Sequence, residues 1–254
     1  MDNSTLNLIH AHGSVRRYKP DPVPASLIER IVAAGQRAST SSNMQTFSVV
    51  AVTDAENRAA LAELCGGQKH IIQAPVFLTW CADRYRLERV CQMRGYAHNA
   101  ETVENFLVAA VDAAIAAQNA ALAAESLGLG ICYIGSIRNN SARVIELLNL
   151  PEHVFPVSGM TIGYPEQPPR IRPRLSQEAI LHWEEYEQDQ DAALYAYDKA
   201  MIETGIYNGR QVDVPGKEGE MEEYGWLEHT ARRTSGLVRA EMLSVIKKQG
   251  FGMK

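Results

Sequence analysis

Cysteine is scarce in this chain of 254 residues. The four cysteines are Cys65, Cys81, Cys91 and Cys132, and no two of them form a CxxC pair. Scattered thiols exclude a disulfide scaffold and are typical of reduced structural residues in a cytoplasmic protein. The N-terminal run MDNSTLNLIHAHG contains neither a basic region nor a long apolar stretch. A secretory signal is therefore not expected there.

An excess of positive charge is also missing. The sequence has 25 Lys and Arg against 30 Asp and Glu, which gives a formal net charge of -5. Proteins whose main partner is a nucleic acid or an anionic membrane carry a basic surplus. We therefore expect neither partner here.

The short motifs that mark common catalytic sites are absent too. There is no GxGxxG after a predicted strand and no GxxxxGK[ST], so neither a dinucleotide-binding Rossmann site nor a P-loop is indicated. GxSxG and HExxH are missing, and the seven histidines lack a Cys/His zinc spacing. We therefore predict no metal site and no side-chain nucleophile, which leaves the chemistry to a bound cofactor.

No uninterrupted apolar run in the sequence is long enough to span a membrane. In residues 106–124, FLVAAVDAAIAAQNAALAA, the apolar run is broken by Asp112, Gln118 and Asn119. A span needs about 20 predominantly apolar residues, so a buried helix is the better interpretation. Its alanines allow another helix to approach closely. Burial inside one subunit and burial at a subunit interface both remain open.

Apolar periodicity predicts the main elements. Strands are expected at 47–54, 74–82, 131–135 and 155–165, and helices at 22–38, 54–67, 101–127 and 139–150. Residues 83–100 are predicted to be irregular. After Pro165 we expect a proline- and arginine-rich connection, a helix at 181–206, a mobile glycine-rich loop at 208–224 and a final helix at 237–250. Strands separated by helices predict a layered α/β or α+β domain.

The stretch HGSVRRYKP, residues 12–20, offers a row of hydrogen-bond donors. His12, Ser14 and Arg16 are two residues apart, so in an extended segment they share one edge while Arg17 points away. An imidazole, a hydroxyl and a guanidinium on one edge suit an anion. Taken alone, however, charged residues near a chain end are more often only solvated.

Three further clusters have the same character. They are STSSN at 39–43, GGQKH at 66–70 and IRPRL at 171–175. Phosphate binding uses this mixture of fixed positive charge, hydroxyls and exposed backbone N–H groups. Each cluster alone is ordinary, but the four together favour a ligand that carries a phosphate.

In combination these motifs resemble the nitroreductase family of FMN flavoproteins, in the branch of NADPH-dependent flavin reductases and oxygen-insensitive nitroreductases. The similarity runs in order through HGSVRRY, GGQKHIIQAPVFLTWCAD, AAESLGLGICYIGSIRNN, LLNLPEHVFPVSGMTIGYP and RPRL, about residues 8–176. It implies an α+β three-layer sandwich with a central, mostly antiparallel sheet, in an intertwined homodimer with FMN at the subunit interface. It further implies an FMN-binding core at 1–176. Residues 177–254, in the same domain, would be C-terminal helices and a mobile loop that embrace the partner subunit.

The resemblance also implies the residues that contact tightly bound, non-covalent FMN. They are His12, Ser14, Arg16, Thr40, Ser41 (with Ser42), Gln68, Tyr133, Ile134, Gly135, Ser136, Arg172 and Arg174. Arg210, with Arg232 and Arg233 behind it, is the candidate for the 2′-phosphate of NADPH. No side chain is expected to be catalytic, because the chemistry takes place at flavin N5. Two departures from the branch are Asn43, where a bulkier residue is common, and the longer, glycine-rich segment 208–228.

The implied activity is ping-pong hydride transfer from NADPH to FMN, and then to a planar acceptor such as flavin, a quinone or a nitroaromatic. Three alternatives stay open. They are a non-catalytic flavin-binding or sensor protein, a family member with specialised chemistry such as reductive dehalogenation or flavin cleavage, and a phosphate-ligand binder without flavin.

Overall fold

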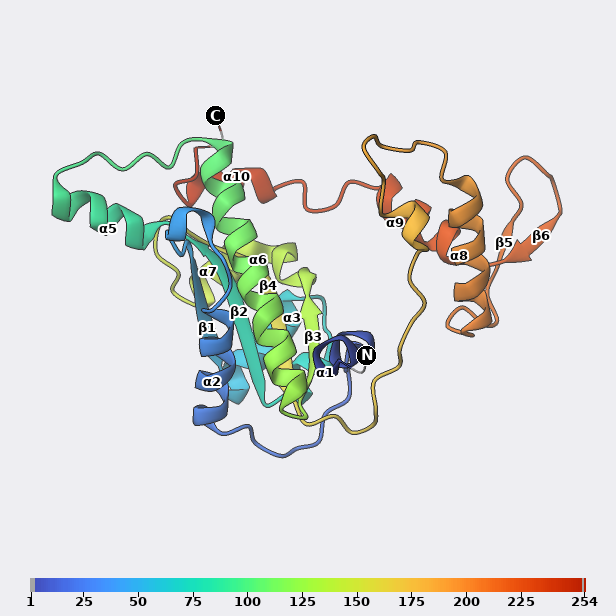
Figure 1. The fold of residues 1–254 in the computed structure, drawn as a ribbon, viewed down its shortest axis with the longest axis horizontal. Coiled ribbons are helices and arrows are strands. Elements are labelled where there is room, and N and C mark those ends of the chain that lie inside the picture. The colour runs from blue at the N-terminus through green and yellow to red at the C-terminus, as the bar shows by residue number, and fades with distance from the viewer. Residues whose placement is uncertain (1–2, 253) are drawn as a thin grey trace. The chain divides into compact units, whose positions relative to one another are not determined.

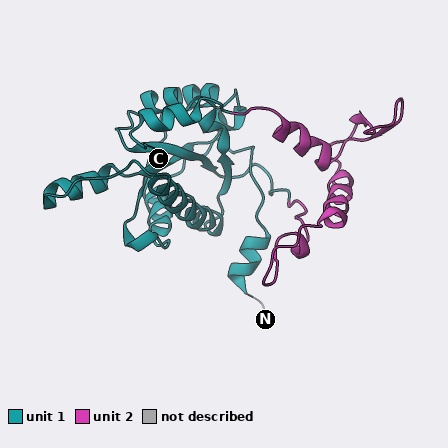
Figure 2. Cartoon of the chain, turned by 90° about the horizontal axis from the view of Figure 1, so that it is seen from above, with its two compact units in different colours: residues 1–170, 239–254 teal, residues 171–238 magenta. Residues whose placement is uncertain are grey.

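The computed structural model describes residues 3–252 and 254. The chain divides into two compact units, residues 1–170 with 239–254, and residues 171–238 (Figure 2). The predicted C-terminal segment 177–254 is thus shared between the units, because its last residues return to the first one.

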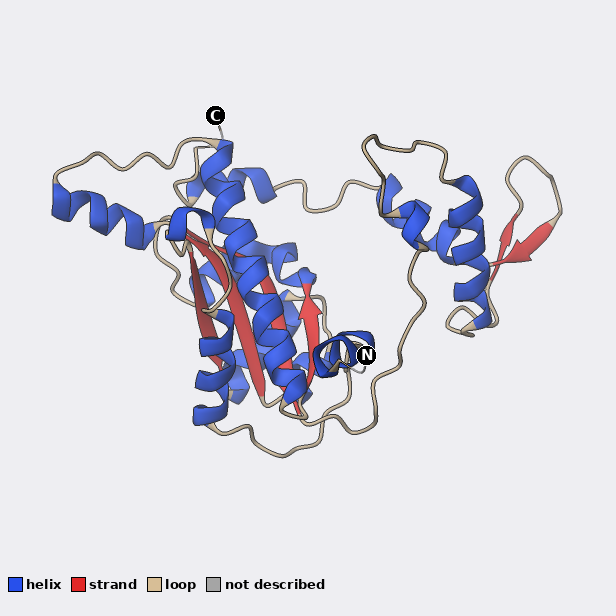
Figure 3. Cartoon of the chain, viewed as in Figure 1, coloured by secondary structure: helices blue, strands red, loops and turns tan. Residues whose placement is uncertain are grey.

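The first unit is built on an antiparallel sheet with strand order β1-β2-β4-β3 (Figure 3). The strands are β1 (Phe47–Val52), β2 (Val76–Asp83), β3 (Gly130–Ile134) and β4 (Val154–Gly163). All three pairings are antiparallel. Every residue of β2 is buried, as expected for a central strand covered on both faces. The four predicted strands are confirmed with small shifts of their ends.

Helices cover both faces of this sheet (Figure 1). On one face lie α2 (Ala25–Gly35) and α6 (Val103–Ser126), whose apolar residues pack with Leu78 and Trp80. On the other lie α3 (Ala55–Leu64), α4 (Lys69–Gln73) and α7 (Ser141–Leu147), around Phe77. The predicted α+β sandwich of three layers is confirmed.

Helix α6 has two different faces. By length and composition alone it is apolar enough to cross a membrane, but its alanines are buried against the sheet and α2. Gly35 of α2 permits this close approach, since a Cβ there would lie 3.0 Å from the Ala116 carbonyl oxygen. The opposite side is a stripe of exposed apolar residues at four-residue spacing, Val103, Leu107, Val111 and Ile115. We call these four residues the α6 stripe.

Three helices of the first unit were missed by the sequence patterns, and the five-residue helix α4 is one of them. Residues 83–100 were predicted to be irregular, but α5 (Tyr85–Arg94) lies there and ends at Gly95, with φ +74°. None of the residues of α5 is buried, so no apolar stripe marks the helix. A short α1 (Ser4–His10) is capped by Asn3, whose side chain accepts from the backbone N–H groups of Thr5 and Leu6.

The final helix, α10 (Met242–Lys248), is shorter than predicted and packs its Ile246 with Phe155 and Phe251.

The second unit contains η3 (Gln177–Ala179), α8 (Asp191–Glu203), β5 (Gln211–Asp213), β6 (Met221–Glu223) and α9 (Trp226–Ser235). The predicted helix at 181–206 was wrong at its start, and the predicted loop at 208–224 contains the β5–β6 hairpin. Helices α8 and α9 pack through Tyr197 and Trp226, and Asp198 accepts from the Leu227 N–H at 2.8 Å. These small contacts leave little periodic signal in the sequence.

Candidate functional site

The donor row of residues 12–16 runs beside the edge strand β3. The Val15 N–H donates to the Ile131 carbonyl at 2.8 Å. A Cβ on Gly130 would lie 2.5 Å from a Val15 methyl carbon, so only glycine allows this approach. Val15 is buried, whereas Ser14 and Arg16 are exposed. Burial alternates from Gly13 to Arg16, as expected of an extended segment, but Arg17 is exposed like Arg16.

Ser14 and Arg16 both act on Cys132 of β3. The Ser14 hydroxyl and the charge of Arg16 oppose the effect of burial on the Cys132 thiol, and the charge of Arg16 also acts on His70 of α4. Burial raises the pKa of the Cys132 thiol. Burial, together with the nearby Arg16, lowers the pKa of His70. Within the described part of the chain, Arg16 forms no ion pair with a carboxylate, so its charge is available to an anion.

Gln68 and Ser136 meet at the end of the same strand. Gln68 donates through Nε2 to Ser136 Oγ at 2.5 Å and to the Cys65 carbonyl at 3.0 Å. Ser136 belongs to the short helix η2 (Gly135–Asn140), which follows β3 directly. Burial raises the pKa of the Cys65 thiol to about 11, although a hydrogen bond with Ser136 opposes the shift. Two of the predicted FMN contacts are therefore brought together.

The side chains of His12, Tyr133 and Ile134 point elsewhere. His12 Nδ1 lies 2.6 Å from Glu125 Oε1 near the end of α6. Tyr133 packs on the α6 face of the sheet, and its hydroxyl donates to Gln118 at 3.4 Å. Ile134 is buried in the core on the opposite face, so only its backbone is free to meet a ligand.

A cavity of about 220 Å³ borders the donor row near Glu125. Gly13, Val15, Glu125, Gly130 and Pro165 are among the residues that line it.

The loop with Thr40 and Ser41 is held in place by α6. Asp112, which is 2% exposed, accepts from the backbone N–H groups of Ser41 and Thr46 at 3.0 and 3.1 Å, and from the Thr46 hydroxyl at 2.6 Å. Ser42 and Asn43, in η1 (Ser41–Asn43), and Gln45 all have positive φ. Sequence reasoning treated Asp112 only as an interruption of an apolar run. A single acid inside an alanine-rich helix was the available signal.

The donor row and this loop are far apart within one chain. Asp112 holds the loop and Glu125 contacts His12, and both belong to α6. Thirteen residues of α-helix span about 20 Å. One chain therefore does not bring all of the predicted contacts to one place.

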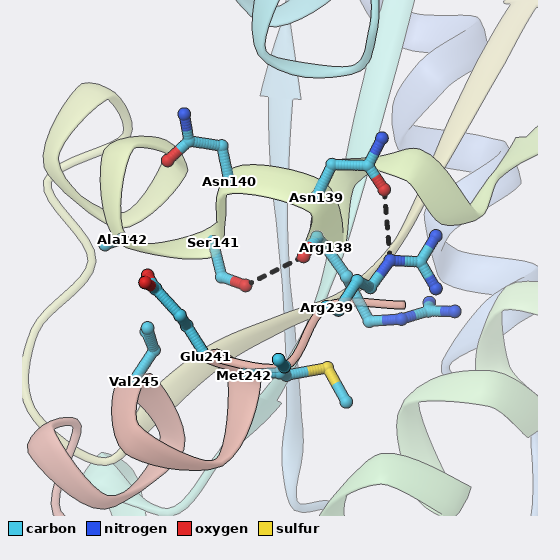
Figure 4. A pocket seen from close by; sticks show the side chains of 10 residues that line it. Arg138, Asn139, Asn140, Ser141, Ala142, Arg239, Glu241, Met242 and Val245 are labelled. Atoms are coloured by element: carbon cyan, nitrogen blue, oxygen red, sulfur yellow. Dashed lines mark hydrogen bonds between the residues drawn. The ribbon is translucent and has the colours of Figure 1, made fainter. Parts of the chain in front are cut away.

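A second pocket, of about 160 Å³, opens next to η2 (Figure 4). Arg138 and Arg239 lie side by side in it. Arg239 Nε donates to Asn139 Oδ1 at 3.0 Å, while Arg138 donates to the Val157 carbonyl. Burial lowers the pKa of Arg138, and the charge of Arg239 adds to the effect. Sequence reasoning missed both arginines, because they are 101 residues apart and neither is part of a motif.

In the second unit, Arg210 and Arg232 gather around one tyrosine. Each guanidinium carbon lies 5.7 Å from the centroid of the Tyr224 ring. Arg232 is also paired with Glu228, whereas Arg210 has no ion pair among the described residues.

Arg233 follows Arg232 in α9, and the remaining predicted arginines of this unit are at its beginning. Arg174 donates to the backbone carbonyls of Arg172 and Pro173, both at 3.1 Å.

Comparisons with known proteins cover the whole chain. The model of the nitroreductase family matches residues 9–164, and that of the family's C-terminal domain matches residues 172–254. The chain belongs to the nitroreductase family. The second match includes all but one residue of the second unit and the final residues that return to the first.

Relatives in the nitroreductase family match along their full length. The chain is 36% identical to the oxygen-insensitive NADPH nitroreductase of Salmonella typhimurium, covering 98% of this chain and 99% of the relative. It is 39% identical to the FMN reductase [NAD(P)H] of Bacillus subtilis, covering 98% of each. The structure of B. megaterium NfrA2 matches with a TM-score of 0.92 at 34% identity, over 100% of both chains.

Proposed function

We propose that this chain is an FMN-dependent NAD(P)H oxidoreductase that reduces flavins, quinones or nitroaromatic compounds. The observation that carries the proposal is the end-to-end similarity to proteins named FMN reductase and NADPH nitroreductase. Because both family models match in order, the NAD(P)H-dependent reductase activity named for those relatives is the activity expected here.

The donor set beside β3 fits FMN. Ser14 and Ser136 supply hydroxyls, Gln68 an amide and Arg16 a guanidinium without an acidic partner. The FMN phosphate is an anion and its ribityl chain carries hydroxyls, so these are the groups it requires. Arg172 and Arg174 are proposed to add positive charge at the phosphate, with the backbone of residues 133–135 beside the ring.

Bound FMN would supply the redox chemistry, taking a hydride at N5 and passing it to the acceptor. The protein positions the reactants and places the charge of Arg16 where negative charge develops. Burial keeps the Cys65 and Cys132 thiols protonated at neutral pH, so neither is a nucleophile in this site. We therefore assign no catalytic side chain.

We further propose that the complete site requires a cytoplasmic homodimer. The separation of about 20 Å along α6 between the donor row and the Thr40–Ser41 loop supports this. In a dimer, the loop of one subunit can complete the site of the other. The α6 stripe provides an exposed apolar face for such an interface, and residues 177–254 would embrace the partner.

For the reducing nucleotide we propose NADPH. Arg210 has no acidic partner among the residues described, and with Arg232 it forms a basic patch around Tyr224. A 2′-phosphate distinguishes NADPH from NADH, and arginine is suited to bind it.

An absorbance spectrum of the purified protein, followed by anaerobic titration with NADPH and NADH, tests the function. We expect a yellow protein that NADPH bleaches and that a quinone or nitroaromatic reoxidises. A folded, colourless protein that takes up no FMN would favour a phosphate-ligand binder. A yellow protein that neither nucleotide bleaches would favour a non-catalytic flavin protein. Reoxidation only by a specialised acceptor, such as a halogenated aromatic, would favour the specialised chemistry.

A further inference from the structure

Three potential metal ligands converge in the first unit, outside the proposed FMN site. Glu88 comes from α5, His98 from the connection between α5 and α6, and His153 from the residue that precedes β4. One ligand atom from each lies within 4.8 Å of the others. Glu88 Oε2 and His153 Nε2 are 3.6 Å apart. The two imidazole rings lie edge to face with their centroids 5.2 Å apart.

His153 is fixed firmly in this position. The backbone N–H of His153 donates to the Gln249 carbonyl at 2.8 Å, and the backbone carbonyl of His153 accepts from the Arg84 N–H at 2.8 Å. The ring packs against Gly250, where a Cβ would lie 2.5 Å from it. The backbone thus holds one ligand before any metal binds, which reduces the entropy lost on binding.

One ring nitrogen of the cluster lacks the partner that buried nitrogens normally have. His98 Nε2 is buried and without a hydrogen-bond partner in the described structure, and His153 faces Glu88 through its Nε2. A buried imidazole nitrogen without a hydrogen-bond partner has a lone pair available to a metal.

We propose that Glu88, His98 and His153 bind one divalent transition-metal ion, with Zn²⁺ as the preferred ion. Two imidazoles and one carboxylate form a known zinc donor set, with water in the fourth position. Zinc bonds of about 2.1 Å place tetrahedral ligands about 3.4 Å apart, near the observed separation of Glu88 and His153. The separations that reach up to 4.8 Å would shorten toward this value when the ion binds.

The bound ion would join the exposed helix α5 and its following connection to the start of β4, beside the C-terminal residues. Arg84, whose charge is felt by His98, disfavours a cation and limits the affinity. Glu88 offsets that charge. None of the three ligands belongs to the donor set proposed for FMN.

Zinc binding is measured on tag-free, full-length protein after chelator dialysis. Isothermal titration with ZnCl₂ is expected to show one site per chain, and saturating Zn²⁺ is expected to raise Tm. His98→Ala is the deciding variant, because His98 lies in a surface connection. It should weaken binding at least about tenfold, since even outer-shell changes cost that much. Glu88→Gln should do the same.

His10→Ala, an exposed histidine on α1, is the matched control and should bind zinc like the wild type. Co²⁺ provides a second readout, because three protein ligands and a water give a visible absorption band that His98→Ala should abolish. The proposal is wrong if the wild type binds no zinc, or if His98→Ala and Glu88→Gln both bind it unchanged. FMN content is measured in parallel and is expected to be equal in all of these proteins, so failure here is distinct from failure of the proposed function.

Discussion

Arg16 and Arg17 are adjacent and chemically identical, but their surroundings differ. Arg16 belongs to the row with Ser14 and acts electrostatically on His70 and Cys132. No such influence of Arg17 on a buried group is found in the described structure. This difference in the groups that they reach provides a matched pair of substitutions.

We expect Arg16→Ala to weaken FMN binding about 10- to 100-fold, because it removes a hydrogen bond to a charged group worth about 1.5–3 kcal/mol. Arg17→Ala should retain flavin like the wild type. Flavin released on dilution, followed by fluorescence, measures both. Full occupancy and turnover in Arg16→Ala would contradict its assignment to the FMN site.

Arg210→Ala should raise the KM for NADPH about tenfold and leave the KM for NADH unchanged, since only NADPH carries the 2′-phosphate. Steady-state kinetics with both nucleotides measures the difference. An equal effect on both nucleotides would show that Arg210 shapes the unit without recognising the phosphate.

His70 predicts a pH dependence of stability. Its folded-state pKa is lowered by burial and by Arg16. Between that value and the ordinary histidine pKa of 6.5, the unfolded chain binds more protons than the folded chain. The free energy of unfolding therefore falls as the pH drops below about 6.5. Urea unfolding at about pH 7.5 and about pH 5.5 measures the loss of unfolding free energy between them, and this loss should be smaller in His70→Asn than in the wild type. An equal loss in both would exclude His70 as a cause.

At the scale of elements, periodicity predicted the buried ones well. All four strands of the main sheet and helices α2, α3, α6 and α7 have apolar residues at the spacing their packing requires. It failed for α5, which buries none of its residues, and for the β5–β6 hairpin of three-residue strands. An element that buries little leaves no periodic pattern to detect.

The loop of residues 40–46 depends on Asp112 of another element. Asp112→Ala leaves two backbone N–H groups and the Thr46 hydroxyl without their acceptor, and should cost about 3 kcal/mol of unfolding free energy. Asp112→Asn keeps one oxygen acceptor and should cost less. Asn119→Ala on the same helix is the control. Chemical denaturation measures all three, and equal stability of Asp112→Ala and the control would remove this role.

At the scale of the whole molecule, subunit assembly decides whether the site is complete. Val111→Glu places a charge in the centre of the α6 stripe, and burying it in an interface would be costly. We expect the variant to sediment as a monomer and to lose FMN, whereas the wild type sediments at twice the chain mass. Glu56→Lys on α3, an exposed charge reversal, should leave the dimer intact. A wild-type monomer that carries FMN would contradict the two-subunit site.

The sequence by itself determined the strands, the buried helices, the donor row and the family. These follow from local spacing and from motifs whose residues are close together in the chain. Only the tertiary structure decided that Gln68 meets Ser136, that Asp112 holds the loop at 40–46, and that Arg138 lies beside Arg239. The same is true of Glu88, His98 and His153. Those contacts join residues from 10 to 101 positions apart, and chain folding sets such distances through packing that no local pattern encodes.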